Sequence, residues 1–214
     1  MPDLVIAGTG QPEIFPIIDD YNDNCSSHKE RFNVIGFIDD NPGNARKEVL
    51  GNRVVGAFDW IVGKDVFVIN AIARSCLVRL QSTLRLESLG ARFVNVVHPS
   101  VTLSYLDDIG AGNIVSVGVR LNPGVSIGSH NMFLTGTVLG HGTKVGSCCF
   151  FGHNAVCNGD VFVSNNVFIG SGCQVLPGVK LAAGTKLSPG SVLMSHTKEG
   201  CQYVGNPARQ VPVT

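Results

Sequence analysis

The feature that most constrains the fold is a strict six-residue period in the C-terminal half of the chain. From Val97 to Leu187 every sixth residue is apolar, through sixteen consecutive hexads with no insertion. The fifth position of each hexad is small or β-branched in nearly every case, and the second is often Gly. This repeat predicts a triangular parallel β-helix with three hexads per turn, whose first-position side chains point inward. We expect the second-position glycines to relieve the tight turns between faces.

The N-terminal half follows a different pattern, because strand-like and helix-like segments alternate from residue 3 to residue 97. Strands are expected at 4–7, 34–38, 66–69 and 93–97, and helices at 14–21 and 77–89. Apolar residues at positions 77, 80, 84, 86 and 89 predict the buried face of the second helix. The alternation favours a small parallel sheet of Rossmann-like type. We therefore expect an α/β domain over 1–96 and a β-helix domain with a C-terminal tail over 97–214.

The charge balance and the cysteines limit the class of protein. The chain has 16 basic and 16 acidic residues, so nothing predicts a nucleic-acid partner. No apolar stretch approaches the roughly 20 residues of a membrane helix, and the N-terminus does not look like a signal peptide, so no membrane insertion is expected. Seven cysteines without a CxxC pair favour reduced thiols and a cytoplasmic protein.

The hexads, the N-terminal VIAGTG, the GFIDD segment and the terminal VGNPAR together resemble the bacterial nucleotide-sugar acetyltransferases of the PglD/NeuD/PerB kind. The resemblance implies a Rossmann-like domain joined to a left-handed β-helix, in a homotrimer with active sites between subunits. It implies acetyl-CoA as co-substrate, no metal, and N-acetylation of a nucleotide-linked amino sugar for surface glycan or lipopolysaccharide precursor synthesis. Two alternatives stay open: a sugar O-acetyltransferase of the sialic acid type, and a non-catalytic β-helix assembly module.

His141 is the candidate general base. It occupies the third position of its hexad, where side chains point outward at a turn, and the ordinary pKa of histidine, about 6.5, suits proton removal from an attacking amine. The resemblance supports this role, because the family's catalytic histidine stands in the context V-x-x-H-x-x-x-I-G, matched here by VLGHGTKVG. A solvent-facing corner histidine is the structural alternative.

The same comparison shows departures. Gly142 stands where the family usually has Glu or Asp, a carboxylate that could orient the imidazole. Phe150 occupies the place of a second histidine, and His153 follows three residues later as a candidate second site histidine. His98 and His130 are expected to be structural. A zinc site of the γ-class carbonic anhydrase type fits poorly, because the histidines at 130, 141 and 153 are eleven and twelve residues apart.

The resemblance also predicts binding residues outside the histidines. Gly8 and Gly10 follow a strand and precede a helix, the context of a turn that cradles phosphate, although the third glycine of the usual fingerprint is missing. A plain tight turn is the structural alternative for Gly8 and Gly10. A turn or helix cap is the structural alternative for Asp39 and Asp40. The predicted nucleotide-sugar-binding residues are Gly8, Gly10, Gln11, Asp39, Asp40 and Asn70.

Acetyl-CoA is expected to lie along the β-helix, held by backbone groups at third-position corners. The matching positions are Gly159, Ser171 and Pro189, and Pro189 offers no N–H. The segment from Tyr203 to Arg209 is expected to cover the nucleotide end of the cofactor, with Arg209 near a CoA phosphate. Cys149 stands at an inward fifth position, so packing accounts for it better than nucleophilic chemistry.

Overall fold

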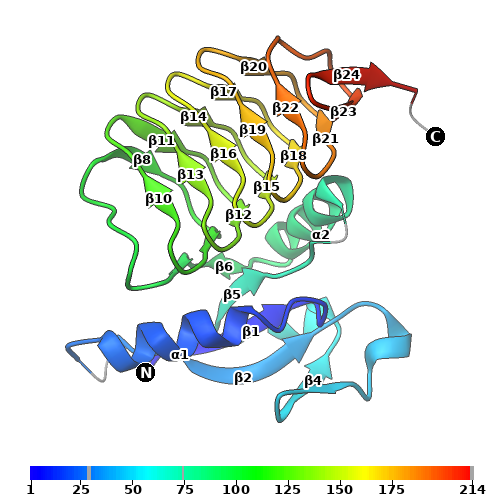
Figure 1. Cartoon of the computed structure of the whole chain (residues 1–214). Helices are drawn as coiled ribbons and strands as arrows, with labels where there is room; N and C mark the ends of the chain where they lie inside the picture. The colour runs from blue at the N-terminus through cyan, green and yellow to red at the C-terminus, as the bar shows by residue number, and fades with distance from the viewer. Residues whose placement is uncertain (28–29, 74, 213–214) are drawn as a thin grey trace.

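The computed structural model describes residues 1–27, 30–73 and 75–212. An open sheet with two helices forms the N-terminal part, and three parallel sheets form the coils of a β-helix above it (Figure 1). The protein is thus mostly β, with parallel sheets and few helices. Among the described residues, no helix has the length and apolar character needed to cross a membrane.

The N-terminal sheet has six strands in the order β3-β4-β2-β1-β5-β6. The neighbours from β4 to β6 pair in parallel, and only β3 and β4 are antiparallel. The strands are β1 (Asp3–Ala7), β2 (Asn33–Ile38), β3 (Glu48–Val49), β4 (Asn52–Gly56), β5 (Phe67–Asn70) and β6 (Arg92–Phe93). The helices are α1 (Ile14–Asn24) and α2 (Cys76–Ser88), with short 3₁₀ turns η1 (Pro42–Asn44) and η2 (Phe58–Ile61).

Each turn of the β-helix takes eighteen residues, so that, for example, Phe133 pairs with Phe151. The first face consists of β7 (Val96–Val97), β9 (Ile114–Val115), β12 (Met132–Phe133), β15 (Phe150–Phe151), β18 (Phe168–Ile169), β21 (Lys186–Leu187), β23 (Gln202–Gly205) and β24 (Ala208–Val211). The second face consists of β8 (Leu106–Ile109), β11 (Val125–Ile127), β14 (Lys144–Val145), β17 (Phe162–Val163) and β20 (Lys180–Leu181). The third face consists of β10 (Arg120–Leu121), β13 (Val138–Leu139), β16 (Val156–Cys157), β19 (Gln174–Val175) and β22 (Val192–Leu193).

The predicted hexad register is confirmed over most of its length. First positions from Val115 to Leu187 are buried in one continuous core, and the fifth positions are buried with them. The prediction is wrong at Leu103, which is 38% exposed, because residues 98–105 form a loop that interrupts the first coil. The repeat also continues one hexad further than predicted, to the fully buried Leu193.

The glycines of the β-helix have two roles. The predicted role, relief of the tight turns between faces, belongs to the fourth position of the hexad and not to the second. The left-handed corner falls at the fourth position of the hexad, which is why Gly142 has φ +65°. Second-position glycines instead allow close contact between coils. A Cβ on Gly128 would lie 2.6 Å from the carbonyl oxygen of Gly146, and a Cβ on Gly140 would lie 2.5 Å from the carbonyl carbon of Asn158.

The predicted buried face of the second helix is confirmed at Leu86, which is fully buried, but it is wrong at Leu77 and Leu84. Leu77 and Leu84 are exposed, whereas the buried residues of α2 are Cys76, Arg79, Ser82, Thr83 and Leu86. The polar members of this set have partners. Arg79 donates from Nε to the carbonyl oxygen of His130 at 2.7 Å, so α2 is fastened to a corner of the β-helix through a buried guanidinium.

The two parts are joined along the first face. The single strand predicted at 93–97 is two strands: β6 pairs with β5 in the N-terminal sheet, and β7 pairs with β9 in the β-helix. Ile14 and Ile17 of α1 share a buried cluster with Ile114 and Met132 on that face. At the far end, Tyr203 is buried in the β-helix core, so the β23–β24 hairpin closes the last coil.

Candidate active site

His141 lies at the corner where the chain passes from β13 on the third face to β14 on the second face. Its side chain is 72% exposed, as predicted for a third-position residue. The imidazole lies directly over Gly159 on the next coil, because a Cβ on Gly159 would be 2.4 Å from Cε1 of His141 and 2.6 Å from Nε2. A basic nitrogen is therefore presented to solvent at the edge of the β-helix.

The carboxylate of Asp160 lies beside this ring. Its Oδ2 is 3.9 Å from Nδ1 of His141, and its backbone N–H donates to the carbonyl oxygen of His141 at 2.8 Å. A Cβ on Gly142 would lie 2.3 Å from Oδ1 of Asp160. The carboxylate of Asp160 thus occupies the space that a side chain at position 142 would fill. Asp160 lies on the next coil, nineteen residues after His141 in sequence.

His153 lies at a different edge of the β-helix, between the first and third faces. It is exposed, and it shares its edge with the third-position residues Ser171 and Pro189. Gly159 shares the edge of His141 instead. The predicted acetyl-CoA residues of one chain are therefore split between two edges that border the third face.

Four of the predicted nucleotide-sugar residues line one cavity of about 390 Å³ at the end of β1 and β2, and they are Gly8, Gly10, Gln11 and Asp39. Gly8 needs to be glycine, because its φ is +90° and a Cβ would lie 2.4 Å from Cγ1 of Ile72. The carboxylate of Asp39 accepts from the Asn41 N–H at 2.9 Å and from the Asn44 amide at 2.8 Å.

Lys47 is a lining residue of this cavity that the sequence did not point to. Its ammonium donates to Thr9 Oγ1 at 3.1 Å and to the Thr9 carbonyl oxygen at 3.4 Å. It reaches the Gly8–Gly10 turn from the segment after η1, which has no motif that would mark it. The cavity therefore combines a glycine turn with a cation, a pair suited to a phosphate group.

The other two predicted residues have structural partners. Asp40 accepts from the Phe58 N–H at 2.8 Å and pairs with Arg85 of α2 at 2.5 Å. Asn70 is fully buried and does not line the cavity. Its amide donates to Ser82 and Thr83 at 2.9 Å each and accepts from the Ile72 N–H at 3.0 Å. This set of bonds holds α2 on β5 and leaves the predicted ligand contact of Asn70 without support.

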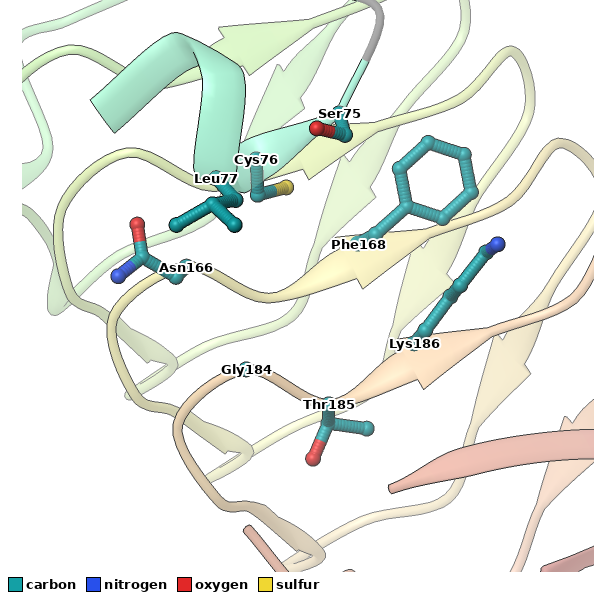
Figure 2. Close-up of a pocket in the computed structure, with 8 residues that line it drawn as sticks. All are labelled: Ser75, Cys76, Leu77, Asn166, Phe168, Gly184, Thr185 and Lys186. Atoms are coloured by element: carbon teal, nitrogen blue, oxygen red, sulfur yellow. The ribbon is translucent and has the colours of Figure 1, made fainter. Parts of the chain in front are cut away.

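A larger cavity of about 450 Å³ lies where the first turn of α2 meets the later coils, and no predicted site residue lines it. Figure 2 shows Leu77 pointing toward Asn166, with Phe168 and Lys186 on neighbouring strands beside them. Its lining residues are Ser75, Cys76, Leu77, Asn166, Phe168, Gly184, Thr185 and Lys186.

The remaining candidates for chemistry are buried or already paired. Cys149 is fully buried, and burial raises the pKa of its thiol, so packing accounts for it as predicted. His130 is also buried, which lowers the pKa of its imidazole, and His98 is bonded to Asp20 and Ser100 at 2.8 Å each. Within the described residues, no three His, Cys, Asp or Glu side chains are grouped so that they could hold a metal ion. Arg209 is exposed on β24, where its Nη1 donates to the Ala208 carbonyl oxygen at 3.3 Å.

Solved structures similar to this chain include nucleotide-sugar N-acetyltransferases. The perosamine N-acetyltransferase of Caulobacter crescentus, solved with CoA and GDP-perosamine and with a histidine replaced by asparagine, is 25% identical with a TM-score of 0.85. The match covers 100% of this chain and 98% of that one. WeeI of Acinetobacter baumannii is 25% identical, with a TM-score of 0.82 over 99% of this chain and 100% of that one. The acetyltransferase domain of PglB from Neisseria gonorrhoeae is 18% identical, with a TM-score of 0.85 over 99% and 100%.

Comparison with protein-family models gives no match, and comparison with curated proteins gives none either. The solved neighbours that share this fold are acetyltransferases bound to CoA, which supports an acyltransferase. Within that class the neighbours are nucleotide-sugar N-acetyltransferases, which confirms the resemblance stated from the sequence. One further neighbour, again the PglB domain, was solved with acetyl-CoA.

Proposed function

We propose that this protein transfers the acetyl group of acetyl-CoA to the amine of a nucleotide-linked amino sugar, as in the synthesis of surface glycan or lipopolysaccharide precursors. The observation that carries the proposal is the end-to-end match with an enzyme solved with CoA and GDP-perosamine, which includes both the N-terminal sheet and the β-helix. We infer that residues 1–96 are a Rossmann-like nucleotide-sugar-binding domain and that residues 97–214 are a left-handed β-helix acetyltransferase domain.

The proposed base is His141. Its Nε2 removes the proton as the amine attacks the thioester carbonyl, the C–N bond forms, and the C–S bond breaks when the tetrahedral intermediate collapses. The proton held by His141 then passes to the departing CoA sulfur, which restores the neutral imidazole. The exposure of the ring at the edge of the β-helix supports this role, because an acceptor and a thioester must both reach it.

The nucleotide is proposed to bind in the cavity at Gly8, Gly10, Gln11 and Asp39. Backbone N–H groups of the glycine turn and the Lys47 ammonium are suited to the phosphates. Acetyl-CoA is proposed to lie along the edges that carry Gly159, Ser171 and Pro189, with Arg209 near a phosphate. Because these residues occupy two edges of one chain, we propose a homotrimer in which neighbouring subunits complete each site, and in which His153 of one subunit approaches His141 of the next.

The test is acetyl transfer by the wild type and by His141→Asn, with a panel of UDP-, GDP- and dTDP-linked amino sugars. CoA release and the mass of the product are measured. We expect one amino sugar to be N-acetylated, and His141→Asn to lose roughly 10²- to 10⁴-fold in kcat, as for removal of a general base. His196→Asn is a matched control, because His196 is also an exposed histidine.

Three results would change the proposal. Full turnover by His141→Asn would remove the base assignment while leaving the reaction in place. An ester product from a sugar hydroxyl would favour the O-acetyltransferase alternative. No transfer to any member of the panel would favour an assembly module.

A further inference from the structure

The imidazole of His141 has no acidic neighbour in sequence, because the next residue is Gly142. The structure gives a reason for that glycine. Position 142 is a left-handed corner with φ +65°, and the space next to its Cα is filled by the carboxylate of Asp160 from the following coil. A larger residue at 142 and the present Asp160 side chain would occupy the same volume.

The imidazole of His141 lies against both Gly159 and Asp160. The ring lies directly over Gly159, since a Cβ on Gly159 would lie within 3.0 Å of three ring atoms of His141. Asp160 lies beside the ring. Its Oδ2 is 3.9 Å from Nδ1 of His141, which is within ion-pair range but longer than a hydrogen bond. The backbone bond from Asp160 N–H to the His141 carbonyl oxygen, at 2.8 Å, fixes the spacing of the two residues.

We propose that Asp160 is the positioning residue for His141 and supplies, from the next coil, the carboxylate that is missing at position 142. This inference rests on the proposed role of His141 as the base. Asp160 accepts a hydrogen bond from Nδ1–H, which leaves the Nε2 lone pair free for the proton of the attacking amine and stabilises the imidazolium that forms. Catalytic hydrogen bonds are often long without substrate and shorten in the complex, so a separation of 3.9 Å is compatible with this role.

Corner geometry alone does not require an acid at position 160. Asp160 has φ +59°, and the equivalent corners at 154 and 166 are occupied by asparagine at φ +56° and φ +59°. Asparagine is therefore an adequate corner residue in this β-helix. Both members of the His141–Asp160 pair are 72% exposed, so the pair contributes little to folding. The substitution Asp160→Asn thus removes the charge and keeps the corner.

The first experiment needs no substrate. The ¹⁵N and ¹³C spectrum of the His141 imidazole reports which ring nitrogen carries the proton. We expect the Nδ1–H form to be enriched in the wild type, and Asp160→Asn to move the population toward the Nε2–H form. Equal populations in the two proteins would overturn the inference, whatever reaction the protein catalyses.

The second experiment uses turnover. We expect Asp160→Asn to lower kcat roughly 10- to 100-fold, by analogy with removal of the carboxylate partner of a metal-bound histidine, with KM unchanged for both substrates. In a His141→Asn background the same change should have no further effect, because residues that act as a unit are not additive. Asn166→Gly is the control for loss of a corner side chain, and it should leave kcat unchanged.

The third experiment moves the carboxylate. In the variant Asp160→Gly the space over Gly142 is empty, and kcat should fall; adding Gly142→Asp should restore a substantial part of it. Retention of full kcat by Asp160→Asn, or an equal loss with and without His141, overturns the inference. If His141→Asn loses activity and Asp160→Asn does not, only the positioning role fails; if neither variant loses activity, the base assignment itself fails.

Discussion

The two parts of the molecule bury their polar side chains in different ways. The β-helix core is a stack of aliphatic and aromatic residues, and the polar side chains buried with it, such as Asn113 and Asn131, bond to the backbone of neighbouring coils at an eighteen-residue spacing. The N-terminal sheet has an apolar core as well, and α1 joins it to the β-helix through apolar contacts, but α2 is held there by polar groups. Arg79 and Asn70 are both buried there and make directed hydrogen bonds. The β-helix is held by packing and hydrogen bonds that repeat from coil to coil, and the attachment of α2 depends on single, specific contacts.

This difference has a functional counterpart. The β-helix holds corner residues at fixed spacing, so His141, Gly159 and Asp160 are aligned by backbone pairing between coils. The cavity at β1 and β2 is instead assembled from segments without a shared register, namely the glycine turn and the residues around η1. A regular scaffold suits a proposed base whose position must be precise, and an irregular one lets neighbouring segments adapt to the nucleotide sugar that we propose to bind there.

The largest effect is expected from the repeating core. Phe151 is fully buried and stacks on Phe133 with ring centroids 4.7 Å apart. We expect Phe151→Ala to lower the free energy of unfolding by about 3–5 kcal/mol, since it removes buried area and leaves a cavity. Urea unfolding followed by circular dichroism measures it. The control is Phe162→Ala, at 45% exposure, which should change little; a similar loss in both variants would contradict a core dominated by the inward stack.

A smaller effect is expected from the polar attachment of α2. Asn70→Ala leaves the Ile72 N–H and two hydroxyl groups without their partner, so we expect a loss of about 1–3 kcal/mol in the free energy of unfolding. The exposed Asn24, which makes one bond to the Asp20 carbonyl oxygen, provides the control Asn24→Ala. If Asn70→Ala is as stable as the wild type but loses affinity for a nucleotide sugar, the predicted ligand contact replaces the structural role.

The β-helix could be predicted from the sequence because its period leaves a mark at every sixth residue. The exceptions are local: Leu103 keeps the apolar character of its position although the first coil has a loop there. The buried face of α2 could be predicted only in part. Apolar periodicity identifies the buried Leu86, but it also marks the exposed Leu77 and Leu84, and it has no means of marking a buried Arg79. One partner of this guanidinium, the carbonyl oxygen of His130, lies 51 residues away in sequence, which no local pattern encodes.

The candidate site also has a feature that the sequence predicted and features that it did not. The exposure of His141 at a corner followed from its place in the hexad. Its neighbour Asp160 did not, although the eighteen-residue coil would have pointed to it, because position 160 is the same corner as 142 one coil later. The sequence has no pattern that would place Lys47 at the site, since its side chain enters the cavity from an irregular segment.

The smallest effect concerns pH and the joint between the two parts. His130 packs edge-on against Phe93, near Glu87 and Arg79, and burial lowers the pKa of its imidazole below the ordinary value. The folded state therefore binds fewer protons than the unfolded state, so this contribution to stability is present above about pH 6.5 and is lost as pH falls below it. His130→Asn keeps the left-handed corner, at φ +61°, and removes the titrating group. We expect the loss of unfolding free energy between about pH 7.5 and about pH 5.5 to be smaller in this variant, as measured by urea unfolding at each pH. An equal or greater loss in His130→Asn would show that acid acts on the joint through other groups.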